Sequence, residues 1–251
     1  MTVLTDFGRH KTGEPDPDDA ARATRTTWRE RLGPIVGGAL LGVAYWKLLR
    51  PRMLNWGATP AEIARPFPGD DLLPDPGAES TMAVDVSAPA DLVWPWLVQL
   101  GQEQGGFYSY EWAENLVGLG IHNADEIRPE WQDLEVGDTI RLGRADRFPE
   151  AMLEVAAFDP EKSLVLRTPD DPTWWVWSFV FDPIDETTTR LLVRSRIRLP
   201  ENPVVRVASL AALDPVSSLM TYGMLQGIRS RAERLARTGR AATGSDPSRE
   251  R

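Results

Sequence analysis

The pattern of apolar and polar residues divides the chain into five segments. Residues 1–31 show no apolar periodicity and include an acidic, proline-rich stretch, so we expect them to be disordered. Residues 32–49 begin with fifteen uncharged residues, LGPIVGGALLGVAYW, and predict an apolar helix. Residues 50–79 are rich in proline and predict a connector. Residues 80–237 carry the periodic patterns of a folded domain, and residues 238–251 predict a disordered tail.

The apolar helix fits two environments. A membrane-spanning helix needs about 20 residues, and the run is close to that length. Two Gly-x-x-x-Gly spacings favour close packing in lipid, and Tyr45 and Trp46 lie where interfacial aromatics occur. The alternative is a soluble helix packed against the domain. The run starts too late for a cleaved signal peptide, so we expect a protein that is cytoplasmic or membrane-anchored through residues 33–49.

The connector contains one clear helix signal. Thr59-Pro60-Ala61-Glu62 has the spacing of a capping box with proline at the first helical position, and predicts a short helix. The prolines that follow, from Pro66 to Pro76, favour an extended backbone. The acidic residues Asp70, Asp71 and Asp75 are able to bind cations, but we expect solvated connector surface here.

The folded domain begins with a strand and two short helices. Residues 81–87 alternate and predict a strand. A helix with an internal proline follows from Pro89 and ends at Gly101, and a second helix covers about residues 109–117.

Five strands are expected in the second half of the domain. Their ranges are residues 139–142, 152–158, 163–167, 174–181 and 188–199. A hairpin loop at residues 182–186 joins the last two. Aromatic residues share one face of residues 174–181, and arginines alternate with apolar residues in 188–199, so we expect an antiparallel sheet with one apolar face and one solvent-facing face.

Helices are expected to end the domain. A short helix covers residues 204–213, and a long one covers residues 214–237, with Asp214 as its N-cap and Pro215 at its first position. The expected inner stripe of the long helix contains Val216, Met220, Gly223, Gly227 and Arg231.

Composition excludes several kinds of site. The chain has 251 residues, a net charge of −9, no cysteine and two histidines, so thiolate chemistry and a three-histidine metal site are excluded. Residues 66–161 hold 20 acidic and four basic side chains, which argues against nucleic-acid binding. Neither a phosphate-binding loop nor a dinucleotide fingerprint is present, and we expect no metal and no cofactor.

The order of elements resembles the START-like (SRPBCC) superfamily, which includes lipid-transfer proteins and polyketide cyclases. Residues 86–94, VSAPADLVW, look like its first strand entering its first helix, and WSFVF at 177–181 with TRL at 189–191 looks like its last hairpin. The blocks at 105–110 and 122–132 look like a bacterial subgroup of uncharacterised members. The resemblance covers about residues 80–237. It implies an α+β helix-grip fold, with a curved antiparallel sheet wrapped around a long C-terminal helix and two short helices after the first strand.

The resemblance also implies a ligand cavity between the sheet and the long helix. Gly223 and Gly227 would leave room there, and an aromatic wall suits a lipophilic small molecule. The alternative is that the aromatic residues simply fill the core. The candidate ligand-binding residues are Phe107, Tyr108, Tyr110, Trp112, His122, Trp131, Trp177, Phe179, Met220, Gly223 and Gly227.

Three functional hypotheses follow. The first is a carrier or sensor that binds or transports a lipophilic small molecule. The second is a cyclase or dehydratase acting on a polyketide-like or aromatic substrate, with His122, Tyr110 and Glu111 as catalytic candidates. The alternative to a catalytic role is that the His122 ring caps a turn. The third is a protein-interaction module that uses the acidic surface. No sequence feature indicates an oligomeric state.

Overall fold

The computed structural model describes residues 33–34 and 36–244, so the segment expected to be disordered at 1–31 lies outside the described residues. The chain forms two units, Met1–Leu49 and Arg50–Arg251. In the first unit residues 36–44 are helical and continue into a π-helix, η1 (Tyr45–Leu49), with several exposed apolar side chains. Membrane insertion of this segment stays a prediction. By length and composition, the one helix of the described part that is able to cross a membrane is C-terminal, at Pro203–Gly239.

The second unit is built on a six-stranded antiparallel sheet, which confirms the predicted fold class. The strand order is β1-β6-β5-β4-β3-β2. Their bounds are β1 (Ala78–Val86), β2 (Thr139–Arg141), β3 (Met152–Asp159), β4 (Ser163–Arg167), β5 (Trp175–Asp185) and β6 (Thr188–Ile197). β5 and β6 extend the predicted hairpin, because β5 continues through Asp185 and leaves a tight turn at residues 186–187.

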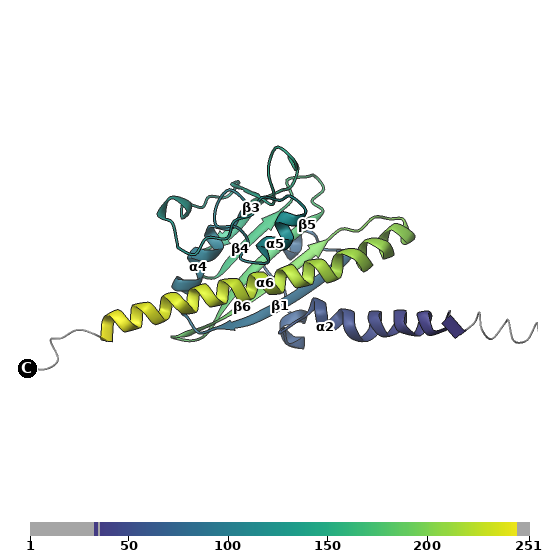
Figure 1. Cartoon of the computed structure of the whole chain (residues 1–251), viewed down its shortest axis with the longest axis horizontal. Helices are drawn as coiled ribbons and strands as arrows, with labels where there is room; N and C mark the ends of the chain where they lie inside the picture. The colour runs from purple at the N-terminus through teal and green to yellow at the C-terminus, as the bar shows by residue number, and fades with distance from the viewer. Residues whose placement is uncertain (1–32, 35, 245–251) are drawn as a thin grey trace, which may run out of the picture. The chain divides into compact units, whose positions relative to one another are not determined.

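The C-terminal helix, α6 (Pro203–Gly244), lies across one face of the sheet and contacts β1 and α4 (Figure 1). It is one helix, so the prediction of two helices was wrong. The Asp214-Pro215 pair does not start a helix. The carboxylate of Asp214 instead accepts a hydrogen bond from Arg50 Nε at 2.6 Å, and Pro215 lies within the helix. α6 also includes residues 238–244 of the predicted tail, and the rest of that tail, residues 245–251, lies outside the described residues.

Short helices complete the unit. They are α2 (Arg50–Leu54), α3 (Pro60–Ala64), η2 (Asp70–Leu72), α4 (Ala90–Val98), α5 (Glu111–Leu116) and η3 (Pro129–Trp131). The capping box predicted for α3 is confirmed. Thr59 N–H donates to Glu62 Oε2 at 2.6 Å, and Glu62 N–H donates to Thr59 Oγ1 at 3.3 Å.

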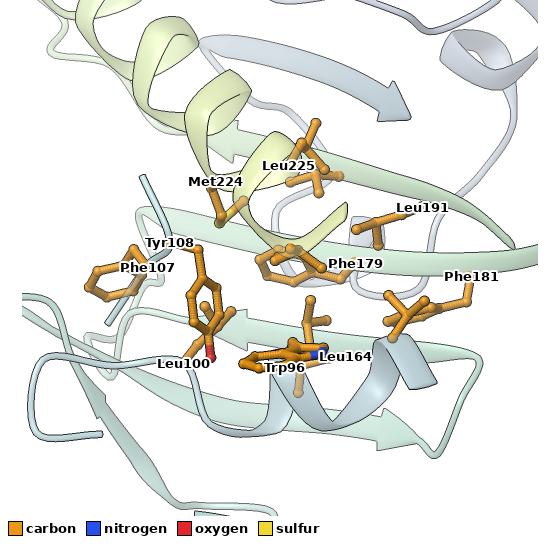
Figure 2. Packing of buried hydrophobic residues seen from close by; sticks show 14 of the residues in the cluster. Trp96, Leu100, Phe107, Tyr108, Leu164, Phe179, Phe181, Leu191, Met224 and Leu225 are labelled. Atoms are coloured by element: carbon orange, nitrogen blue, oxygen red, sulfur yellow. The ribbon is translucent and has the colours of Figure 1, made fainter. Parts of the chain in front are cut away.

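The core lies between α6 and the inner face of the sheet (Figure 2). Phe179 and Leu191 come from β5 and β6, and Met224 and Leu225 come from the facing side of α6. Trp96 of α4 closes the core from the side. The period-two pattern of β5 therefore places its aromatic residues on the inner face, as the sequence predicts.

The outer face of the sheet is covered, so the prediction of a solvent-facing arginine face was wrong for most of β6. Residues 57–77, the outer strap, lie against this face. Phe67 packs against Ala83 and Leu192, and Leu73 packs against the outer side chains of β4 and β5. The strap shields from water the arginines that the sequence pattern assigns to a wet surface.

Arg194 is the most enclosed of these arginines, with 2% of its surface exposed. Its five N–H groups donate to Thr81 Oγ1, to Asp70 Oδ2 and to three backbone carbonyl oxygens of residues 62–65. Its guanidinium group also lies 3.8 Å from the centre of the Phe67 ring. Asp70, which we expected to be solvated, is therefore part of the internal packing.

Arg190 and Glu62 form a second link between sheet and strap. Two nitrogens of Arg190 donate to the two carboxylate oxygens of Glu62, at 2.8 and 2.9 Å. The hydrogen bond from Arg190 lowers the pKa of Glu62 to about 2. This bidentate geometry fixes α3 on β6.

Candidate functional site

The segment at residues 105–110 forms one side of the candidate site. Tyr108 has a positive φ of 57°, and its backbone N–H donates to Asn123 Oδ1 at 2.7 Å. Its ring packs edge-on against Trp96, and its hydroxyl accepts a hydrogen bond from Gln99 at 3.0 Å. Burial raises the pKa of Tyr108 to about 12. Figure 2 shows Tyr108 beside Trp96, below the turn of α6 that carries Met224.

This segment approaches α6 at the two glycines of the helix. A Cβ atom on Gly227 would clash with the carbonyl oxygen of Tyr108, and one on Gly223 would lie 2.8 Å from the Tyr110 ring. The sequence interpretation gave this space to a ligand. The structure fills it with the protein itself, because the absence of side chains lets residues 108–110 reach the helix backbone.

A cavity of about 360 Å³ lies beside this contact, between the inner face of the sheet and α6. Leu213, which is 62% exposed, lies on its wall, so the cavity reaches the protein surface there. Apolar side chains form most of the lining: Leu54, Ala78, Met82, Phe107, Leu142, Trp174, Trp175, Trp177, Ile197, Leu199, Leu210, Leu213, Met220 and Met224. Its volume falls within the usual range for small-molecule sites.

Most charged groups of the cavity wall are paired. Asp214 is bound to Arg50, and Glu79 lies 3.0 Å from Arg196. Glu114 differs, because its Oε1 accepts a hydrogen bond from Ser109 Oγ at 2.5 Å while its Oε2 has no partner among the residues that the structure describes. Burial raises the pKa of Glu114.

Ser218 of α6 is the second unpaired polar group of the wall. It is 5% exposed, and its Oγ has no hydrogen-bond partner within the described ranges, 33–34 and 36–244. Two other wall hydroxyls have partners. Ser195 Oγ accepts a hydrogen bond from Trp175 Nε1 at 2.9 Å, and Ser217 Oγ donates to the carbonyl oxygen of Asp214 at 3.3 Å.

The structure places three of the predicted ligand-binding residues on the cavity wall: Phe107, Trp177 and Met220. Tyr108 and Phe179 are buried in the core next to it. Trp112 is 73% exposed and, like Trp131, is not part of the wall. Tyr110 packs against Gly223 without lining the cavity.

His122 and Glu111 are brought together, but at the surface. His122 Nδ1 lies 3.0 Å from Glu111 Oε1, and the histidine side chain is 84% exposed. The Asn123 N–H and then the His122 ring lower the pKa of Glu111. His122 lines a separate polar depression with Arg144 and Arg147 instead of the cavity. The structure therefore does not place the predicted catalytic pair on the apolar cavity.

Glu114 and Ser218 were not among the residues selected from the sequence. Glu114 lies on a six-residue helix with Glu111, and so short a helix gives no periodicity that separates a buried acid from an exposed one. Ser218 is one of two consecutive serines in α6. Only the position of the cavity distinguishes it from Ser217.

No family model matches the chain, and no curated protein matches it. Solved structures similar to it include the Zhui aromatase/cyclase from Streptomyces sp. R1128, at 15% identity and a TM-score of 0.38, covering 62% of this chain and 94% of that one. Protein BH1534 from Bacillus halodurans is similar at 15% identity and a TM-score of 0.41, covering 63% and 99%. Protein CV1439 from Chromobacterium violaceum is similar at 12% identity and a TM-score of 0.40, covering 62% of this chain and 98% of that one. The fold assignment rests on the strand order and on α6 themselves.

Proposed function

We propose that this protein binds a lipophilic small molecule in the cavity between the sheet and α6. The observation that carries the proposal is the cavity itself, whose wall is mainly apolar and holds three tryptophans, Trp174, Trp175 and Trp177. Moving an apolar ligand from water to such a wall is favourable by about 25 cal/mol for each Å² of apolar surface buried. Carrier and sensor roles both need this step.

Membership of the START-like superfamily, and of its bacterial subgroup, is part of the same proposal. The sheet order and the single long helix over the inner face support it, together with the sequence blocks at residues 86–94 and 105–110. A cyclase or dehydratase activity has one supporting observation, the buried carboxyl of Glu114 on the cavity wall. The lining favours binding as the function to test first.

The test uses a neutral naphthylamine fluorophore and energy transfer from the cavity tryptophans. Thr221 lines the cavity from α6, and Thr221→Trp would occupy part of its volume. Thr238→Trp is the matched control, since Thr238 is an exposed threonine of the same helix that does not line the cavity. We expect saturable binding to the wild type and to Thr238→Trp, with affinity at least about tenfold lower in Thr221→Trp. Equal affinity in all three proteins would refute binding in this cavity.

We also propose that residues 33–49 associate with lipid. Leu40 and Leu41 are exposed apolar side chains of this helix, as its sequence pattern requires for contact with a bilayer. Full-length protein is expected to float with neutral lipid vesicles. A Leu40→Glu/Leu41→Glu variant should stay in the soluble fraction, and flotation of both proteins would contradict the proposal.

A further inference from the structure

The cavity wall carries two buried polar atoms without a protein partner. Glu114 Oε2 and Ser218 Oγ each belong to a residue that is 5% exposed, and each lines the cavity. Burying a polar group without a hydrogen bond costs free energy, and folded proteins keep few such groups. The two residues come from different elements, α5 and α6, and both belong to the wall of the same cavity.

Four other polar residues of the wall have partners within the protein. The carboxylates of Asp214 and Glu79 have arginine partners, and the hydroxyls of Ser195 and Ser217 have hydrogen bonds. At these four residues the protein itself supplies the hydrogen-bond or ion-pair partner. Two buried unsatisfied groups on one mainly apolar wall indicate that a ligand supplies the missing partners.

We propose that the cavity ligand is a lipophilic alcohol or phenol whose hydroxyl group hydrogen-bonds with Glu114 and Ser218. The inference rests on the proposed function, that the cavity takes an apolar molecule. A hydroxyl group donates one hydrogen bond and accepts others, so it complements both a carboxyl oxygen and a serine hydroxyl. It carries no charge into the apolar cavity, whereas a carboxylate ligand would meet the carboxyl group of Glu114.

The geometry around Glu114 supports its role as the anchor. Ser109 Oγ donates to Oε1 at 2.5 Å and fixes the orientation of the carboxyl group. Ser109 is itself held at α6, since its Cβ would lie 3.3 Å from a Cβ placed on Gly223. One oxygen is thus committed to the protein, and the other is left for the ligand.

The experiment compares three naphthalene probes that differ in one substituent: 2-naphthol, 2-methylnaphthalene and 2-naphthoate. We expect the wild type to bind 2-naphthol about tenfold or more tightly than 2-methylnaphthalene, because a site built to hydrogen-bond a hydroxyl rejects the analogue that lacks it. We expect 2-naphthoate to bind most weakly. The measurement is the dissociation constant of each probe, from quenching of tryptophan fluorescence.

Two variants and one control locate the preference. Ser218→Ala and Glu114→Leu should each reduce the preference for 2-naphthol to within about threefold, and leave the affinity for 2-methylnaphthalene unchanged. Ser230→Ala is the control, since Ser230 is an exposed serine of α6 that does not line the cavity and whose hydroxyl donates to the carbonyl oxygen of Gly227. It should keep the full preference. If Glu114→Leu does not fold, Ser218→Ala and the wild-type ratio still decide the question.

The outcomes separate the two proposals. Equal binding of 2-naphthol and 2-methylnaphthalene by the wild type, with both weakened in Thr221→Trp, would overturn the hydroxyl inference and leave the cavity as a binding site. A preference that survives in Ser218→Ala and Glu114→Leu would also overturn it. Failure of every probe to bind, or binding unaffected by Thr221→Trp, would overturn the proposed function and the inference with it.

Discussion

The most enclosed arginine of the outer face differs from the two unpaired polar side chains beside the inner face. On the outer face, Arg194 is enclosed by the outer strap, and all five of its N–H groups have acceptors. On the inner face, Glu114 and Ser218 keep an oxygen without a partner in the described part of the chain. Both sides bury polar atoms, but Glu114 and Ser218 are residues of a cavity wall, whereas Arg194 is not.

The difference separates structure from function within one sheet. A buried charge whose hydrogen bonds are all made holds segments together. Removing it leaves its partners buried without a hydrogen bond, which lowers the free energy of unfolding. An unsatisfied polar group beside a cavity adds no internal contact. It costs stability, and such costs are typical of positions kept for binding. Substitutions on the outer face should therefore change the stability of the protein, and substitutions beside the inner face should change its ligand preference.

The largest effect is expected on the outer face. Arg194→Met should lower the free energy of unfolding by about 3–5 kcal/mol, because it leaves Asp70 and several backbone carbonyl oxygens buried without a donor. The measurement is urea unfolding followed by tryptophan fluorescence. Arg198→Met is the control, since Arg198 is an exposed arginine of the same series, and it should change stability by less than about 0.5 kcal/mol. Equal effects would remove the contrast between buried and exposed arginines.

The contact between α6 and residues 108–110 should give the next largest effect. Gly227→Ala places a Cβ atom against the carbonyl oxygen of Tyr108, and the backbone must move to admit it. We expect a loss of about 2–4 kcal/mol in unfolding free energy. Gly239→Ala in the same helix has open space around its Cβ and should be neutral or stabilising by about 0.5–1 kcal/mol. If Gly227→Ala causes no loss of stability, the space beside Gly227 is available to a ligand, as the sequence predicts.

Tyr108, which forms part of the same contact, should make the stability of the protein depend on pH in the alkaline range. Its pKa is 10 when unfolded and about 12 in the folded protein, because burial disfavours the phenolate. The folded state therefore loses stability relative to the unfolded state as the pH rises from 10 towards 12, by about 2 kcal/mol. Below pH 10 this contribution is fully present.

Tyr108→Phe tests this dependence, since phenylalanine cannot ionise. Unfolding free energies of the two proteins are measured across the alkaline range. The wild type should lose more stability than Tyr108→Phe between pH 10 and pH 12. Parallel pH profiles would show that Tyr108 ionises as readily in the folded protein as in the unfolded chain.

The sequence predicts features that depend on neighbouring residues and misses those that depend on distant ones. Period-two patterns and local turn signals predicted the strands and the capped helix α3, because both depend on neighbouring residues. The outer strap was missed, because the burial of Arg194 depends on residues more than 120 positions away in the chain. The Asp214-Pro215 pair was read as a helix start for the same reason, since the distant Arg50 holds its carboxylate. Glu114 and Ser218 acquire significance only beside the cavity that distant segments form.

The smallest stability effect, and the sharpest contrast with Arg194, is expected at Ser218. Ser218→Ala removes a buried hydroxyl that has no partner among the residues described, so it should leave stability unchanged or raise it by about 0.5–1 kcal/mol. Ser217→Ala, which removes a bonded hydroxyl, should not stabilise. Urea unfolding of both variants without ligand gives the comparison. A clear loss of stability in Ser218→Ala would mean that the hydroxyl has a structural partner after all, and the inner face would then resemble the outer one.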